Sequence, residues 1–156
     1  DTFLGSDEPA HHNDPSIINN TLYEDFCFNL KPLLHRVIPI RKSSIIASED
    51  FDDKSVDFVY IDANHAYDYV KEDIELWYPK VKKGGILMGH DYINMDWYND
   101  PNFLENGKDK HIYSADGFYF GVFGVNPAVD EFCAEHDLTI EYVTQDGCPT
   151  YFIYKK

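Results

Sequence analysis

The sequence contains few cysteines, few basic residues and no long hydrophobic run. Its three cysteines, Cys27, Cys133 and Cys148, form no CxxC pair, which argues against a disulfide framework or a structural zinc site and favours a reducing, cytoplasmic compartment. Only 13 Lys and Arg stand against 28 Asp and Glu, so the net charge is -15. Such an acidic surface repels phosphate groups, which argues against nucleic acid and anionic membranes as partners.

The chain does contain enough apolar residues for a core. Hydrophobic residues make up 44% and aromatic residues 16% of its 156 residues, so we expect one folded domain over residues 1–156. Residues 93–124 lack any period and are rich in Asn, Asp, Gly, Tyr and Phe. A loop of that length in a compact domain is usually functional, and we predict a lid or substrate loop here.

Residues 56–92 carry the clearest structural pattern. Residues 57–61 are rich in Val, Phe, Tyr and Ile, which is typical of a strand buried on both faces. Residues 66–78 have apolar side chains at spacings of three and four and predict an amphipathic helix. Residues 86–89 follow a Gly-Gly turn and predict a second strand. Together these elements predict a right-handed βαβ unit.

Polar pairs follow both predicted strands: Asp62 with His65, and His90 with Asp91. In an open parallel sheet, ligands bind outside the carboxyl ends of the strands. We therefore expect both pairs to face one crevice. This is the layout of an active site, and it makes an enzyme the leading hypothesis.

Weaker patterns precede this unit. Asn20 or Thr21 can cap a helix that runs to about Leu34, and we expect Pro32 to end or bend it. Residues 37–40 predict a short strand, and Pro39 favours an edge position for it because proline cannot donate to a sheet ladder.

Further patterns follow the unit. Asn126 predicts a helix N-cap, with Pro127 as the first helical residue. Residues 139–144 and 149–154 flank Asp146-Gly147, and they predict a C-terminal antiparallel pair of strands.

Three motifs carry a family resemblance: the opening DTFLG of residues 1–5, IDANHAY at residues 61–67, and WYPKVKKGGILMGHDY at residues 77–92. With them the chain resembles class I S-adenosylmethionine-dependent methyltransferases, in particular a bacterial branch that acts on sugars and other small molecules. The resemblance implies an α/β, Rossmann-like, mostly parallel sheet with helices on both faces, strand order 3-2-1-4-5-7-6 and a C-terminal antiparallel hairpin. It also implies methyl transfer from S-adenosylmethionine to a hydroxyl of a small acceptor.

The resemblance further implies roles for single residues. The cofactor would be bound by Asp1, Thr2, Phe3, Ser43, Ser44, Asp62 and Ala63. Within this set Asp1 would accept hydrogen bonds from the ribose hydroxyls. His65 is the expected general base, with Asp62 beside the methyl donor as the second catalytic residue. The alternative is that His65 only caps or orients the helix that follows it.

Three family elements have no counterpart in residues 1–156: the glycine-rich loop, the first strand and the first helix. We expect the sequence to begin inside a longer protein. Alternatively, another segment or a second copy of the chain completes the sheet, or the chain is a degraded relative.

A metal site is a second prediction at the same strand ends. Asp62, His90 and Asp91 would bind Mg²⁺ or another divalent cation that holds the acceptor hydroxyls. Two other functions stay open: a non-catalytic binding module, and a metal-dependent enzyme that uses this crevice without a methyl donor.

Overall fold

The computed structural model describes residues 1–5, 11, 13–93, 112–113, 119–121 and 124–156. The chain divides into two compact units, Asp1–Ala47 and Ser48–Lys156, and each is described by itself. The predicted lid falls mostly outside the described residues, which show only its short strands β3 and β4. A single domain over the whole chain stays a prediction.

The first unit is built from short helices. They are α1 (Pro15–Ile18), α2 (Leu22–Asn29), the 3-10 turn η2 (Lys31–Leu33) and α3 (Ser44–Ser48), which reaches the unit boundary. Phe3 has a positive φ of 58° and is buried. Its ring packs against Tyr23 and Phe26, each with a centroid distance of 5.1 Å. This aromatic cluster is the small core of the unit.

The helix predicted to reach Leu34 begins after the cap residue Thr21, as expected, but ends earlier, at Asn29. The separate turn η2 follows, with Pro32 in its first turn, which agrees with the expected break because proline lacks the donor that a continuous helix needs. A second prediction was wrong. Residues 37–40 form no strand. Pro39 removes one ladder donor, and no strand among the described residues pairs with this segment.

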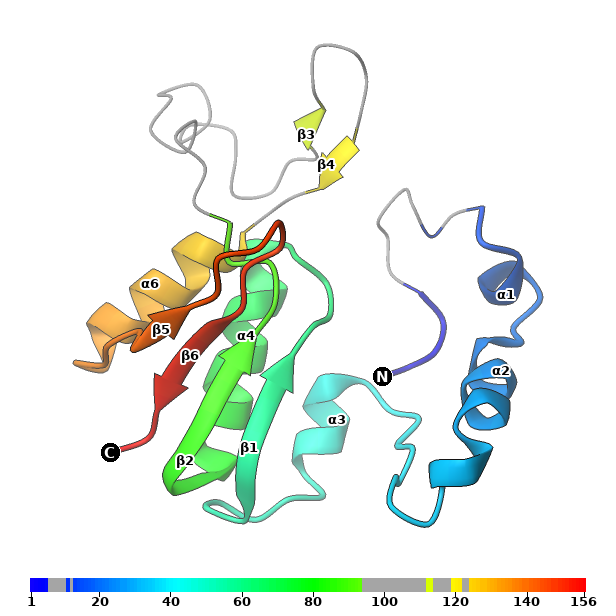
Figure 1. The fold of residues 1–156 in the computed structure, drawn as a ribbon, viewed down its shortest axis with the longest axis horizontal. Coiled ribbons are helices and arrows are strands. Elements are labelled where there is room, and N and C mark those ends of the chain that lie inside the picture. Colours follow the sequence, from blue (N-terminus) through cyan, green and yellow to red (C-terminus); the bar gives the residue numbers. More distant parts are fainter. Residues whose placement is uncertain (6–10, 12, 94–111, 114–118, 122–123) are drawn as a thin grey trace. The chain divides into compact units, whose positions relative to one another are not determined.

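The second unit contains a four-stranded sheet in the order β1-β2-β6-β5 (Figure 1). Its strands are β1 (Val56–Ile61), β2 (Val81–Gly89), β5 (Tyr142–Val143) and β6 (Tyr151–Tyr154), while β3 (Ile112–Tyr113) and β4 (Tyr119–Gly121) form a separate pair. β1 and β2 are parallel, and β6 is antiparallel to both β2 and β5. The order corresponds to the 4-5-7-6 part of the expected sheet, and it confirms the α/β fold and the C-terminal hairpin.

Helix α4 (Tyr67–Trp77), followed by the 3-10 turn η3 (Tyr78–Lys80), connects β1 to β2 and confirms the βαβ unit. It lies beside α6 (Val125–Glu135) on the same side of the sheet (Figure 1). Both helices bury an apolar stripe against the strands. The core contains Val70, Ile74, Leu87, Val129, Phe132 and Ile153.

The sequence predicted that β1 is buried on both faces. This prediction was wrong. Phe58 is 61% exposed and Tyr60 44% exposed, whereas Val59 and Ile61 pack against the core. Among the described residues of the second unit, helices α4 and α6 cover one face of this sheet, and no helix of that unit covers the other.

The start of α6 also differs from the prediction, because the cap is Gly124 and not Asn126. The Gly124 amide donates to the carbonyl of His65 at 2.7 Å. A Cβ at this position would lie 2.2 Å from the Tyr67 nitrogen. Only glycine fits this close approach, so backbone packing sets the helix start.

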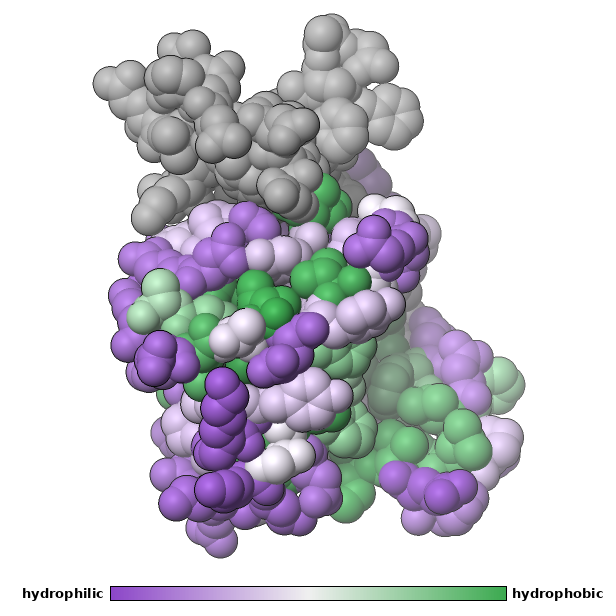
Figure 2. Space-filling model, turned by 60° about the vertical axis from the view of Figure 1, so that its left-hand side comes forward, coloured by the Kyte–Doolittle hydropathy of each residue, from purple (hydrophilic) through white to green (hydrophobic). Residues whose placement is uncertain are grey.

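Figure 2 shows mostly hydrophilic residues on the face that it presents, in line with the net charge of -15. Within the described part of the chain, no helix has both the length and the apolar character needed to cross a membrane.

Candidate active site

The parallel pairing of β1 and β2 brings their carboxyl ends to one edge of the sheet. Ile61, the last residue of β1, pairs with Gly89, the last residue of β2. The amide of His90 donates to the Ile61 carbonyl at 3.0 Å. Asp62 and His90 therefore leave neighbouring strands side by side. This confirms that the two polar pairs face each other.

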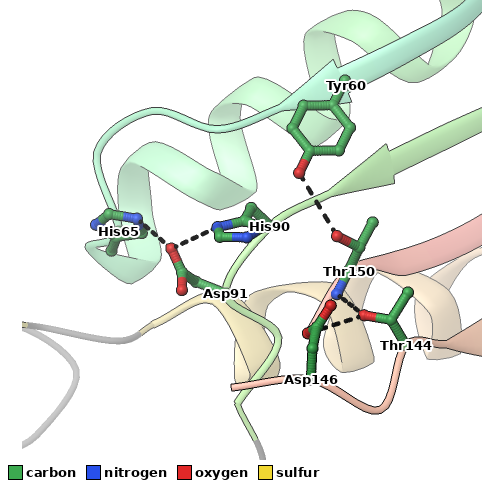
Figure 3. A network of polar contacts seen from close by, with 7 residues as sticks. All are labelled: Tyr60, His65, His90, Asp91, Thr144, Asp146 and Thr150. Carbon is green, nitrogen blue, oxygen red and sulfur yellow. Dashed lines mark hydrogen bonds and ion pairs between the residues drawn. The ribbon is translucent and has the colours of Figure 1, made fainter. Parts of the chain in front are cut away.

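Asp91 joins the two histidines. Its Oδ2 lies 2.9 Å from Nε2 of His65 and 3.1 Å from Nδ1 of His90 (Figure 3). Its side chain is 11% exposed. The hydrogen bond from His65 lowers the pKa of the Asp91 carboxyl; burial opposes this effect and His90 adds to it. The carboxylate is therefore ionised at neutral pH and holds both rings.

The backbone fixes this carboxylate in place. Asp91 has a φ of 58°, in the left-handed region that few residues other than glycine adopt. The next amide, that of Tyr92, donates to the Pro149 carbonyl at 2.9 Å. Uncommon backbone conformations of this kind cluster at functional sites, where the surrounding structure holds them.

The His65 side of the contact is also held. Asn64 Oδ1 accepts from the Ala66 amide at 2.9 Å, which forms a tight turn before α4. The His65 carbonyl accepts from the Gly124 amide at 2.7 Å. Segment 62–66 is thus anchored to the starts of both α4 and α6.

A possible cation site overlaps this contact. Ligand atoms of Asp62, His65 and Asp91 all lie within 4.8 Å of one another. The predicted set was Asp62, His90 and Asp91. Among the described residues, His90 contacts Asp91 but does not belong to the group with ligand spacing. The predicted metal set stays a prediction. Two carboxylates and one imidazole suit Mn²⁺ or Zn²⁺ better than Mg²⁺.

The hairpin loop between β5 and β6 lies beside the site. The hydroxyls of Tyr60 and Thr150 are 3.5 Å apart (Figure 3). Burial raises the pKa of the Cys148 thiol, and the charge of Asp91 raises it further. The sequence did not indicate these residues, because they come from a turn whose pattern predicts only a hairpin. The Asp91–His65 contact was also missed, although both residues were recognised.

The predicted cofactor residues lie in both units. Asp62 and Ala63 follow β1 in the second unit. The first unit contributes Asp1, Thr2, Phe3, Ser43 and Ser44. The two sets of residues thus belong to different compact units.

In the first unit, Asp1 is exposed, and its Oδ1 accepts from the Phe3 amide at 2.5 Å. Thr2 Oγ1 accepts from the Leu4 amide at 3.3 Å. The Phe3 ring is buried in the aromatic cluster, which leaves it little surface for an adenine. The Ser43 hydroxyl accepts from the Ile46 amide at 3.4 Å, in the first turn of α3.

Comparison with known protein families identifies the domain. A family model described as a methyltransferase domain matches residues 7–92, which include β1, α4, β2 and the Asp91 contact. The chain belongs to this methyltransferase family.

Relatives of the methyltransferase are longer than the chain. The uncharacterized protein y4gI of Sinorhizobium fredii is 38% identical over 52 residues, which are 33% of this chain and 6% of that protein. Three solved structures share the fold. A proposed caffeoyl-CoA O-methyltransferase of Staphylococcus aureus has a TM-score of 0.58 and 16% identity, over 90% of this chain and 61% of its own.

The other two solved structures also match most of this chain. An O-methyltransferase family protein of Burkholderia thailandensis has a TM-score of 0.56 and 16% identity, over 91% of this chain and 42% of its own. The O-methyltransferase NovP has a TM-score of 0.54 and 15% identity, over 100% of this chain and 58% of its own. At these identities the likeness establishes the fold.

Proposed function

We propose that this domain transfers a methyl group from S-adenosylmethionine to a hydroxyl of a small acceptor such as a sugar. The contact of His65 with Asp91 carries the proposal, because it places an oriented imidazole at the strand ends of a methyltransferase fold. The acidic surface supports a small acceptor over nucleic acid, since a net charge of -15 repels phosphate.

S-adenosylmethionine, when bound, supplies an activated methyl group on a sulfonium. The residues proposed to hold it offer suitable groups. Asp1 is exposed, and only its Oδ1 is engaged by a described amide, so Oδ2 can accept from the ribose. Asp62 is exposed at the end of β1, where its negative charge would stabilise a neighbouring cation. Ala63 follows it and leaves room for the donor.

His65 would take the proton of the acceptor hydroxyl. Nε2 lies 2.9 Å from the Asp91 carboxylate, which favours the neutral tautomer with its proton on Nε2 and its lone pair on Nδ1. Nδ1 is then the atom that receives the proton, and the fixed Asp91 charge stabilises the imidazolium that results. A positioned base of this kind contributes about 10²–10⁴-fold to a rate.

The test measures transfer of a labelled methyl group from S-adenosylmethionine to a panel of hydroxylated metabolites. We expect the His65→Gln variant to lose at least about 100-fold in kcat. His136→Gln is the matched control, because His136 lies at the far end of α6 against Phe132. Full activity in His65→Gln would refute the base role. Absence of transfer to every acceptor, with no nucleoside bound, would favour the binding-module hypothesis.

A metal-assisted variant of the reaction is the second candidate, and the spacing of Asp62, His65 and Asp91 favours it. The two mechanisms use His65 differently. A cation bound at Nε2 would need the lone pair of that nitrogen. The base mechanism instead needs a proton on Nε2. The same transfer assay with a chelator separates them: loss of turnover that Mn²⁺ restores assigns His65 as a ligand, and unchanged turnover assigns it as the base.

A further inference from the structure

The hydroxyl of Tyr151 lies deep in the second unit, next to the strand ends that form the site. Tyr151 is 1% exposed and begins β6, where it pairs with Gly89. Burial raises the pKa of its hydroxyl, and the nearby charge of Asp73 raises it further. The hydroxyl therefore stays protonated and acts as a hydrogen-bond donor.

Among the described residues, no group accepts a hydrogen bond from this hydroxyl. A buried donor without an acceptor is unfavourable. Buried polar groups of this kind are usually satisfied by ordered water where a polar hollow offers room for it.

A small hollow lies under the segment from Asp62 to His65, and Tyr151 forms part of its wall. Its other lining residues include Ile61, Asn64, His65, Val70, His90 and Val125.

The Tyr151 hydroxyl and the Ile61 carbonyl both approach Gly89 closely. A Cβ at position 89 would lie 2.6 Å from the hydroxyl and 2.7 Å from the carbonyl oxygen, so only glycine fits there. The Ile61 carbonyl already accepts from the His90 amide and keeps a second lone pair. Ile61 and Tyr151 also both line the hollow.

We propose that Tyr151 is a positioning residue that holds one buried water molecule against the Ile61 carbonyl. The water accepts from the Tyr151 hydroxyl and donates to Ile61. It thereby ties β6 to the end of β1, where Asp62 begins and where His90 is bonded. The role in catalysis rests on the proposed function; the water site itself does not.

The test compares Tyr151→Phe with Tyr154→Phe, a control on the same strand whose side chain is 45% exposed. Both variants keep the ring and remove only the hydroxyl. We expect Tyr151→Phe to raise the equilibrium constant for urea unfolding about fivefold, since a net hydrogen bond contributes about 1 kcal/mol. We expect no change for Tyr154→Phe. An unchanged or increased stability of Tyr151→Phe would overturn the proposal, because removing an unsatisfied hydroxyl does not destabilise.

Two further measurements locate the effect. A high-resolution crystal structure should show a water within hydrogen-bond distance of both the Tyr151 hydroxyl and the Ile61 carbonyl; a direct protein partner or an empty hollow would overturn the site. The imidazole ¹⁵N resonances of His65 and His90 should shift in Tyr151→Phe and not in Tyr154→Phe. Unshifted resonances would overturn the positioning role, whatever the activity of the enzyme.

Discussion

Replacing Asp91 with Asn removes the charge that joins the two histidines and changes little else. Asn has nearly the same shape and tolerates the left-handed φ of 58° that Asp91 adopts. Hydrogen bonds to a charged group contribute about 1.5–3 kcal/mol each. The side chains of His65 and His90 are 23% and 33% exposed, so solvent screens both contacts. The Asn oxygen also keeps one acceptor.

We therefore expect Asp91→Asn to lower the free energy of unfolding by about 1–2 kcal/mol at pH 7, which raises the unfolding constant about 5–30-fold. Chemical denaturation measures this value. Asp146→Asn is the control, because Asp146 is exposed and hydrogen-bonds only Thr144 among the described residues. Equal stability of wild type and Asp91→Asn at pH 7 would refute the account of the contact.

The difference should also depend on pH. The pKa of Asp91 is lower in the folded chain than the value of about 3.9 for an unfolded Asp. Its stabilising effect is then complete above about pH 5 and is lost as the pH falls through the folded pKa. The gap between wild type and Asp91→Asn should shrink below about pH 4. A gap of the same size at pH 3 would show that the charge of Asp91 is not its source.

Two more predictions follow from close packing. Gly124→Ala should lower the free energy of unfolding by about 3 kcal/mol, because its Cβ would lie 2.2 Å from the Tyr67 nitrogen. The control Gly147→Ala should change it little, because a Cβ there has nothing within 4 Å. Equal thermal stability of the two variants would contradict this packing. Cys133 is buried, and burial raises its pKa to about 11, so iodoacetamide at pH 8 should label the exposed Cys148 and spare Cys133 until the chain unfolds. Mass spectrometry that finds both thiols labelled at the same rate in the folded protein would show that Cys133 is accessible.

The sequence was sufficient to predict the elements whose residues make local patterns. The helical stripe of α4, the second strand and the polar pairs after both strands all lie within residues 56–92. The predicted Gly-Gly turn was wrong, because Gly84 and Gly85 lie within β2. Parallel pairing then brings Asp62 next to His90 by geometry alone. The C-terminal hairpin was predictable for the same local reason, from Asp146-Gly147 between two apolar segments.

Other features depend on contacts between distant residues. The start of α6 is set by the approach of Gly124 to Tyr67 and not by the capping preference of Asn126. The exposure of Phe58 and Tyr60 on β1 follows from helices that, among the described residues of the second unit, cover one side of the sheet. The close spacing of Asp62, His65 and Asp91 depends on a contact between two segments, which no local pattern indicates.

Titration of S-adenosylhomocysteine into the protein by calorimetry is the most direct test of the proposed function. We predict saturable binding of one nucleoside per chain, weakened at least about tenfold in Asp62→Ala and unaffected in the control Asp146→Asn. Heats equal to buffer dilution for the wild type would contradict methyl transfer as the function of this site.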